Sequence, residues 1–575
     1  MLASDAFPTL TPEQTERLRA VGTEESVRSG DFLFREGDAG FDFFVVLAGE
    51  VQVYQDAACT RRLLPEPARA GQFLGDAGLL LGEVGFATAR VEADGTVLRV
   101  AAETLRALLA SDTDLASTVL TAFGARRAIT SAGSAGLTLV GSRSDPDAVR
   151  LGEFVRRNYL PARWLDFENT PSEAAAALAA HGLAAEALDG PVVFWGSQTV
   201  LHNPSNLALA RAVGIGAEPT DDERFDLVVV GAGPAGLAAA VYGASEGLST
   251  VVVDEIGTGG QAGASSRIEN YLGFPTGISG TNLAVRATVQ ARKFGARFVT
   301  PHQAAALHRD GAGFAVELAD GVRIHGRAVV VATGARYRRL AVPDIERFEG
   351  AGVYYAATEM EARACDAATA VVVGGGNSAG QAAMFLSERF AHVRLLLRGG
   401  DLGKSMSHYL TARIEAAPRI EVNRFTEVRA AHGDGRPAGH EALAAVTLAD
   451  TRAGTTERVA TPALFVFVGA DPCTEWLRGA AGGLALSTDA HGFVCTGSGI
   501  PADWLDPDRW GTHRPDVFET SEPGVFAVGD VRSGSTKRVA GAVGEGSVTV
   551  KSVHSRLASP PVTSLHGEPQ AVPVL

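Results

Sequence analysis

The chain has 575 residues, with 66 acidic and 51 basic side chains and a formal net charge of −15. This length exceeds what one hydrophobic core usually organises, so three or four domains are expected. The acidic balance argues against nucleic acid as a partner and disfavours an anionic membrane surface, because no basic stripe is available to neutralise phosphates.

The ends and apolar runs of the chain predict no membrane span. Residues 1–18 lack the basic stretch and the long apolar run of a secretory signal. The most apolar run, 227–244, is interrupted by glycines and by Pro234, which favours a buried strand, a turn and a helix. A soluble, cytoplasmic protein is therefore expected.

The front of the chain divides into two units. Residues 12–100 alternate short apolar runs with turn signals, which predicts β-strands, and 101–127 has helical apolar spacing. The flexible stretch 131–136 then predicts the end of a first domain over 1–130. From 137 to 218 the pattern reads strand, helix, strand, helix, two strands and a helix, which predicts a compact α/β domain.

A nucleotide-binding turn opens the largest region. An apolar strand leads into Gly231-x-Gly233-x-x-Gly236, a helix and a second strand that ends at Asp254. The first glycine permits the tight turn, the second lets the backbone approach a pyrophosphate, and the third allows helix and strand to pack closely. The helix N-terminus offers N–H donors to phosphates, and Asp254 stands where a carboxylate accepts ribose hydroxyls.

A second turn of the same kind follows at Gly374-x-Gly376-x-x-Ala379. Its second strand ends in Arg398 instead of an acid, and an arginine there favours a 2′-phosphate, unless it is only a solvated surface charge. Two dinucleotide turns imply two dinucleotides, a bound flavin and a diffusible nicotinamide that reduces it.

Several separated motifs resemble thioredoxin reductase of the low-molecular-weight type, within the pyridine nucleotide-disulfide oxidoreductases. They are GAGPAG (231–236), GGQ (259–261), IENYLGFP (268–275), ATGA (332–335), GGGNSA (374–379) and VFAVGDV (525–531). The resemblance implies an α/β fold with two Rossmann-type domains. An FAD-binding domain would span 222–345 and 463–560, and an NAD(P)H-binding domain would span 346–462.

The resemblance also implies site residues. FAD would be bound by Gly231, Gly233, Pro234, Ala235, Gly236, Asp254, Gly260, Gln261, Asn270, Thr333, Gly334, Gly529, Asp530, Lys537, Arg538 and Val539. The NAD(P)H site would contain Gly374, Gly376, Asn377, Ser378, Ala379 and Arg398. NADPH is preferred and NADH is an alternative, because the family has paired arginines where this chain has Arg398 alone, with Lys404 as a candidate second charge. No metal site is expected.

The chain departs from this family at the redox centre. Thioredoxin reductases have Cys-Ala-Thr-Cys-Asp after a tyrosine, whereas Tyr355 is followed here by Ala-Ala-Thr-Glu-Met, 356–360, which cannot form a thiolate or attack a disulfide. By the resemblance Glu359 would lie near the flavin, where it could donate a proton. The alternative interpretation is a capping box, Thr358-x-x-Glu361, in which Glu359 only complements the helix dipole.

The first domain resembles the cyclic-nucleotide-binding β-roll through 29–54 and 71–82. Asp76 replaces the cassette glutamate, and the arginine and hydroxyl positions read Gly85 and Phe86. Because a bound phosphate would lack its arginine, we expect a structural or docking role in preference to cyclic-nucleotide binding.

The second domain is similar to thioredoxin or glutaredoxin. The position of its usual cysteine pair reads SRSDPD, 142–147, so this module too lacks redox thiols. Pro191 precedes an apolar strand, where a cis bond is hypothesised.

The leading hypothesis is an FAD-dependent NAD(P)H oxidoreductase that passes electrons directly to a small molecule or a small redox protein, for example a quinone or a ferredoxin-like protein. One alternative is a disulfide reductase that brings together two of Cys365, Cys473 and Cys495. Another is a flavin- or nucleotide-responsive sensor with little turnover. The resemblance further implies a homodimer.

Overall fold

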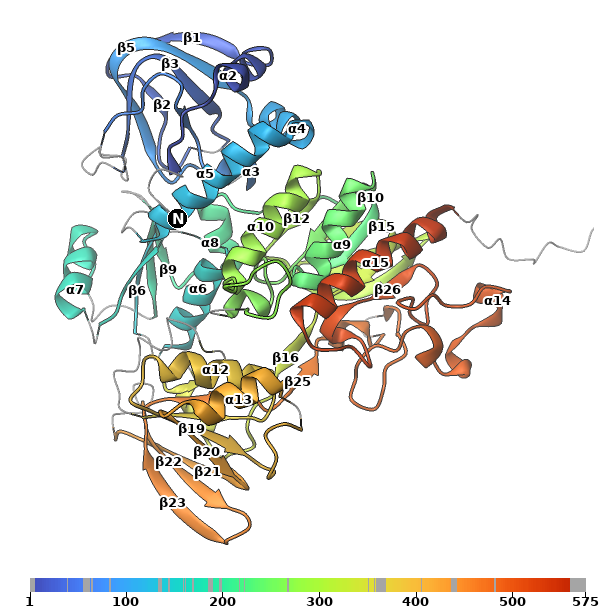
Figure 1. Ribbon diagram of the computed structural model, residues 1–575. Helices are drawn as coiled ribbons and strands as arrows, with labels where there is room; N and C mark the ends of the chain where they lie inside the picture. The colour runs from blue at the N-terminus through green and yellow to red at the C-terminus, as the bar shows by residue number, and fades with distance from the viewer. Residues whose placement is uncertain are drawn as a thin grey trace, which may run out of the picture.

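The computed structural model describes residues 6–558 except 39, 55–62, 64–65, 82–83, 133–136, 143–144, 159, 161, 168–169, 185–189, 196–198, 217, 222, 266–267, 350, 356, 358–368, 405, 436–441 and 480–481. Figure 1 shows a blue β-rich unit, a teal α/β unit and two larger α/β units, one green with the red C-terminal helix and one yellow to orange. This is the predicted fold class. Within the described residues, no helix is long and apolar enough to cross a membrane.

The first unit is an antiparallel β-roll. Its strands are β1 (Thr23–Val27), β2 (Phe32–Phe34), β3 (Phe43–Tyr54), β4 (Phe73–Leu74) and β5 (Thr88–Val100), in the order β1-β5-β3-β4 with β2 on β5. Helices α2 (Pro12–Arg19) and α3 (Ala77–Leu81) complete it. The rings of Phe43, Phe73 and Phe123 meet at 5.2 to 6.3 Å in its core, so a helix that follows the sheet seals the roll.

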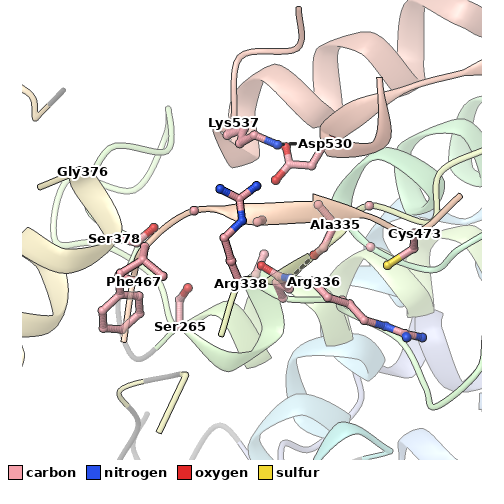
Figure 2. A pocket seen from close by; sticks show the side chains of 18 of the residues that line it. Ser265, Ala335, Arg336, Arg338, Gly376, Ser378, Phe467, Cys473, Asp530 and Lys537 are labelled. Atoms are coloured by element: carbon pink, nitrogen blue, oxygen red, sulfur yellow. Dashed lines mark hydrogen bonds between the residues drawn. The ribbon is translucent and has the colours of Figure 1, made fainter. Parts of the chain in front are cut away.

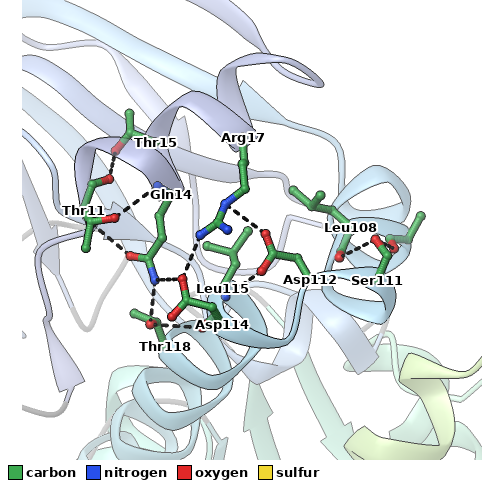
Figure 3. A network of polar contacts seen from close by, with 11 residues as sticks. Thr11, Gln14, Thr15, Arg17, Leu108, Ser111, Asp112, Asp114, Leu115 and Thr118 are labelled. Atoms are coloured by element: carbon green, nitrogen blue, oxygen red, sulfur yellow. Dashed lines mark hydrogen bonds and ion pairs between the residues drawn. The ribbon is translucent and has the colours of Figure 1, made fainter.

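The helical stretch expected at 101–127 forms two helices, α4 (Ala102–Ser111) and α5 (Thr113–Ala132). Asp112 separates them, because its carboxylate accepts a hydrogen bond from the Leu115 amide at 3.0 Å and so caps the second helix. Arg17 of α2 reaches Asp112 at 3.0 Å and Asp114 at 2.7 Å, as Figure 3 shows. The break is therefore fixed by side chains from both ends of the roll.

The second unit has the predicted order of elements: β6 (Leu137–Val140), α6 (Pro146–Arg157), β7 (Ala162–Leu165), α7 (Pro171–Ala180), β8 (Val192–Trp195), β9 (Thr199–His202) and α8 (Asn206–Ala212). The sheet order is β7-β6-β8-β9, with β6 and β7 parallel and the other pairs antiparallel. The hypothesis of a cis bond before Pro191 is wrong, since the cis bond recorded among the described residues is Thr300–Pro301.

The third unit is a mixed sheet in the order β12-β11-β10-β15-β14-β13, with β26 beside β15. Its valine-rich central strands are buried on both faces, as expected of parallel strands. The strands are β10 (Arg224–Val230), β11 (Thr250–Val253), β12 (Arg297–Val299), β13 (Ala304–Asp310), β14 (Gly313–Leu318), β15 (Arg323–Val331) and β26 (Val525–Ala527). Helices α9 (Pro234–Ser245), α10 (Gly280–Lys293) and α15 (Val539–Ala558) contribute to the core on one face.

The fourth unit is a parallel sheet in the order β17-β24-β18-β19-β20, with helices on one face and the antiparallel sheet β21-β22-β23 on the other. Its elements are β17 (Val353–Tyr354), β18 (Thr369–Val373), α12 (Asn377–Ser387), β19 (His392–Leu397), α13 (His408–Ala416), β20 (Ile420–Arg424), β21 (Thr426–Gly433), β22 (Leu443–Asp450), β23 (Thr455–Ala460) and β24 (Leu464–Val466).

Two short strands, β16 (Ala335–Tyr337) and β25 (Ala470–Pro472), pair where the chain passes between the third and fourth units. The sequence predicts that the FAD-binding domain resumes at 463. This boundary is too early, because β24 pairs with β18 and therefore belongs to the parallel sheet of the fourth unit. The other domain limits stay predictions. Helix α14 (Pro507–Trp510) lies in a long connection before β26.

The roll docks on the second unit through its cassette. Phe86, which stands at the hydroxyl position of the cassette, is 1% exposed and packs its ring against Trp195 at 5.5 Å. Both side chains belong to a core with Leu139 and Val193 of the second unit. On the other side, α3 and α4 pack against α10 of the third unit. The cassette is therefore an internal contact surface.

Phe86→Ala is expected to destabilise this contact by about 3–5 kcal/mol, because it leaves a cavity in a closed core. Denaturant unfolding followed by tryptophan fluorescence would measure the change through Trp195. The control Val21→Ala, at a 43% exposed position of the roll, should stay within about 0.5 kcal/mol. Equal effects of the two changes would contradict the docking role of Phe86.

Candidate functional site

One cavity of about 1370 Å³ contains both predicted glycine turns. Figure 2 shows Ser378, Phe467 and Ser265 at one end and Asp530, Lys537, Arg336 and Cys473 around the rest. Among the predicted residues, those that line it are Gly231, Gly233, Pro234, Ala235, Asp254, Gly260, Gln261, Asn270, Thr333, Gly334, Asp530, Lys537, Arg538, Val539, Gly374, Gly376, Asn377, Ser378, Ala379 and Arg398. The fold thus brings residues far apart in sequence to one site.

The first glycine turn fits its expected backbone role. Gly231 has a φ of +107°, and a Cβ there would lie 2.3 Å from the Ala332 carbonyl oxygen. Gly233 is the N-cap of α9, and a Cβ on Gly236 would lie 1.8 Å from the Gly231 carbonyl oxygen. Gly236 is therefore buried beneath the cavity, where it lets α9 begin close to β10 with its free amides at the cavity.

Asp254 organises the backbone around this turn. Its carboxylate accepts hydrogen bonds from the amides of Ala232 at 2.7 Å, Ile256 at 3.0 Å and Gly257 at 3.0 Å. A carboxylate offers about four acceptor positions, so room for a further donor such as a ribose hydroxyl remains.

Asp530 follows β26 in the short helix η8 (Gly529–Val531), where burial raises the pKa of its carboxyl and Lys537 opposes that rise. The Lys537 ammonium donates to the Asp530 carbonyl at 3.4 Å and lies 4.2 Å from the Phe493 ring centre. Gly529 is buried beside Ala235, at a φ of +74°, and does not line the cavity. Its role is to let η8 approach the first turn of α9.

Gln261 and Thr333 both bond to the backbone across the cavity. The Gln261 amide donates to the Ala335 carbonyl, and the Thr333 hydroxyl donates to the Cys473 carbonyl at 2.8 Å. Both acceptors belong to or flank the paired strands β16 and β25. These bonds fix the strands β16 and β25, which connect the third and fourth units, to the wall of the cavity.

The second turn repeats the first at the start of α12. Gly374 has a φ of +144°, and a Cβ there would lie 2.3 Å from the Phe467 carbonyl oxygen. Gly376 is the N-cap of α12, and a Cβ there would meet no atom within 4 Å. Arg398 is exposed at the end of β19 and lines the cavity. Lys404, the candidate second charge, is exposed and is not among the lining residues.

The sequence patterns did not predict three charged residues that line the cavity. Arg429 and Glu427 of β21 line the cavity and pair at 3.1 Å. Arg157, from the second unit, also lines it. Neither arginine follows a nucleotide motif, so no local pattern could have marked it.

The predicted residue Glu359 lies outside the described residues, as does Cys365. Just before that segment, the Tyr355 hydroxyl donates a hydrogen bond to Glu349 at 2.8 Å. Burial raises the pKa of this phenol most, and the hydrogen bond to Glu349 raises it further. The described cysteines are free thiols whose pKa values are raised by burial. Cys473 lines the cavity, whereas Cys495 is buried and is not among the lining residues.

The cyclic-nucleotide cassette uses its polar groups within the roll. The Asp76 carboxylate accepts from the Gly78 amide at 2.7 Å at the start of α3. Buried Arg126 donates to the carbonyls of Phe73 at 2.9 Å and Gly75 at 2.6 Å, and burial lowers its pKa to about 9. Asp76 and Arg126 therefore form hydrogen bonds with the backbone of the roll.

Comparison with known proteins gives the same picture. The pyridine nucleotide-disulphide oxidoreductase family model matches residues 225–546, and a cyclic nucleotide-binding domain model matches 24–112. The chain therefore belongs to the pyridine nucleotide-disulphide oxidoreductase family, which confirms the predicted resemblance and the enzyme class.

The relatives include thioredoxin reductases. The chain is 30% identical over 339 residues to thioredoxin reductase of Bacillus subtilis, which covers 58% of this chain and 95% of that relative. It is 29% identical over 362 residues to one component of the alkyl hydroperoxide reductase of Xanthomonas campestris pv. phaseoli, covering 63% of this chain and 61% of that relative. The crystal structure of T. acidophilum thioredoxin reductase is 28% identical with a TM-score of 0.51, over 59% of this chain and 100% of that chain.

Asp530→Asn is expected to stabilise the FAD-free protein at neutral pH. Because the folded-state pKa of Asp530 is raised above its unfolded value, its ionisation costs stability once the pH exceeds the unfolded value of about 3.9. Melting temperatures of the two proteins should therefore coincide near pH 3 and diverge as the pH rises.

The matched control is Asp450→Asn on β22, where the backbone amides of Ala453 and Arg452 lower the pKa of the carboxyl. Loss of that carboxylate should have the opposite sign and lower the melting temperature at pH 7. A lower melting temperature for Asp530→Asn at pH 7 would contradict the burial argument.

Proposed function

We propose that the enzyme transfers a hydride from NAD(P)H to FAD and then two electrons to a small molecule or small redox protein, with solvent supplying the proton and no dithiol relay. The observation that supports this most is the single cavity, in which the glycine turns at Gly231 and Gly374 face a common space. Asp530, Lys537, Arg538 and Arg398 line the same cavity, and Gly529, next to Asp530, packs against Ala235 of the first turn.

The residues at the first turn fit FAD. The N-terminal amides of α9 and the open position at Gly233 suit a pyrophosphate. Asp254 would accept a ribose hydroxyl, Asp530 would bind the ribityl chain, and Lys537 or Arg538 would stabilise negative charge on the reduced ring. Gln261 and Asn270, which also line the cavity, would face the cofactor.

The residues at the second turn fit NAD(P)H. The amides at the start of α12 suit the pyrophosphate, and Asn377 is held there because its side-chain oxygen accepts from the Ser407 amide at 2.7 Å. Arg398 lines the cavity at the second turn and would favour the 2′-phosphate of NADPH. We therefore propose NADPH as the preferred coenzyme, with NADH as the weaker one.

The absence of cysteines at 356–360 supports direct transfer to the acceptor. Ala357 is half-buried against the core of the fourth unit. A quinone or a ferredoxin-like protein is the proposed class of acceptor, and the enzyme is proposed to be a cytoplasmic homodimer. Glu359 stays a candidate proton donor. The β-roll is proposed to dock the second unit through Phe86 instead of binding a cyclic nucleotide.

A second candidate function is disulfide reduction, which is favoured by the position of Cys473 in the cavity wall. It requires a second thiol close to Cys473, which Cys365 or Cys495 would have to provide; Cys495 is buried and does not line the cavity.

Anaerobic mixing with NADPH should bleach the flavin absorbance of the purified protein rapidly, and NADH should do so more slowly. Arg398→Ala is expected to weaken NADPH binding about tenfold, because a charge-assisted contact to the 2′-phosphate is lost, and to leave NADH nearly unchanged. The control Arg424→Ala, on β20 and outside the cavity lining, should behave as the parent protein. A protein that holds FAD but is bleached by neither coenzyme would refute the proposal.

Replacing all four cysteines by serine separates the two candidates. Direct transfer predicts unchanged turnover with NADPH and a quinone acceptor, since no thiol takes part. Loss of turnover with a disulfide substrate that the parent protein reduces would instead establish the dithiol route. Circular dichroism of the variant would show that it still folds.

A further inference from the structure

The thioredoxin-like unit, residues 137–218, packs against the edge of the third unit where β11 and β12 end. Asn158, directly after α6, donates its side-chain amide to the Ile256 carbonyl at 2.8 Å. The Ile256 side chain packs on the core of the thioredoxin-like unit. At the other end of that unit, a Cβ on Gly216 would lie 1.9 Å from the Thr300 carbonyl oxygen. Dinucleotides bind at this carboxyl edge of a parallel sheet.

The contact at Asn158 holds the turn that Asp254 organises. The Asp254 carboxylate accepts from the amides of Ile256 and Gly257, and Asn158 binds the Ile256 carbonyl from the opposite side. Gly257 is so close that an added Cβ would lie 2.7 Å from the Asn158 side-chain oxygen. The thioredoxin-like unit and the first dinucleotide turn therefore share one segment of backbone.

Arg157, the last residue of α6, extends this contact into the cavity. It lines the same cavity as Asp254, Glu255 and His302, and its side chain is 19% exposed. It pairs with Glu153 at 2.7 Å, while its buried Nε has no hydrogen-bond partner among the described residues. A guanidinium has five N–H donors, so Arg157 can bind an anionic or polar ligand without losing Glu153.

A second, smaller cavity supports the same arrangement. It is lined by Asp147, Arg150 and Asn206 of the thioredoxin-like unit and by Glu255 and Gln303 of the third unit. Glu255 and Gln303 also line the large cavity. Residues of the thioredoxin-like unit therefore line both cavities that contain Glu255 and Gln303.

We infer that the thioredoxin-like unit, which has no cysteine pair, is a fixed cap on the adenosine end of the FAD site. Arg157 contributes a cofactor-binding side chain, and Asn158 is a positioning residue that holds the Asp254 turn. This inference rests on the proposed binding of FAD at the Gly231 turn. It assigns to the unit a binding role in place of a redox role.

The alternative is that Arg157 only forms an i,i+4 ion pair on the helix surface, which would contribute little. The two cases differ in what happens to FAD. A surface pair would leave FAD affinity unchanged, whereas a binding residue would change it without changing the stability of the FAD-free protein.

The test measures FAD release from the purified full-length protein by the rise in flavin fluorescence after dilution, and FAD affinity by titration of the FAD-free protein. Arg157→Ala and Asn158→Ala are each expected to raise the dissociation constant about tenfold, the effect of losing one hydrogen-bonded contact to a charged or buried group. Arg157→Lys, which keeps the charge and the Glu153 pair, should lie between. Arg163→Ala, at an exposed ion pair with Glu173 on the same unit, is the control and should match the parent protein.

The melting temperature of each FAD-free variant separates binding from folding. The inference holds if Arg157→Ala leaves that temperature unchanged and reduces the upward shift that FAD produces. It is overturned if Arg157→Ala and Asn158→Ala release FAD at the parent rate, or if their weaker binding is fully matched by a less stable FAD-free protein. A parent protein that takes up no FAD would instead refute the proposed function.

Discussion

The carboxylate of Asp254 is the interaction on which the site depends. It accepts amide hydrogens from Ala232 in the glycine turn and from Ile256 and Gly257 beyond β11. These bonds fix the loop that follows β11 relative to the start of α9, and so set where a dinucleotide can lie. Asn158 of the second unit binds the same loop, so the loop is held both by this carboxylate and by a neighbouring domain.

The two modules in front of the dinucleotide-binding units contact each other and the third unit. Phe86 stands in the cassette of the β-roll but belongs to the core of the second unit. Asp76 and Arg126 satisfy backbone groups of the roll. The second unit in turn places Arg157 in the wall of the large cavity. The front of the chain is thus a series of docked domains that ends at this cavity.

The loss of redox cysteines is consistent with this arrangement. A dithiol relay needs a thiol pair that moves between the flavin and an outside partner, and the chain has neither pair in the expected places. The large cavity instead joins both dinucleotide turns directly, and Cys473 in its wall has a pKa raised by burial, which disfavours the reactive thiolate.

The sequence by itself determined the two dinucleotide turns, because strand, glycine spacing and helix are local patterns that require Gly231, Gly236 and Gly374 for steric reasons. It also determined the β-roll, the order of elements in the second unit and the missing cysteines. Asp112 caps α5 through the amide of Leu115, three residues on, which is a local signal, whereas tertiary structure added the contact with Arg17. Tertiary structure alone decided the places of Arg157, Arg429 and Phe86, because contacts between separate domains leave no periodic signal in the chain.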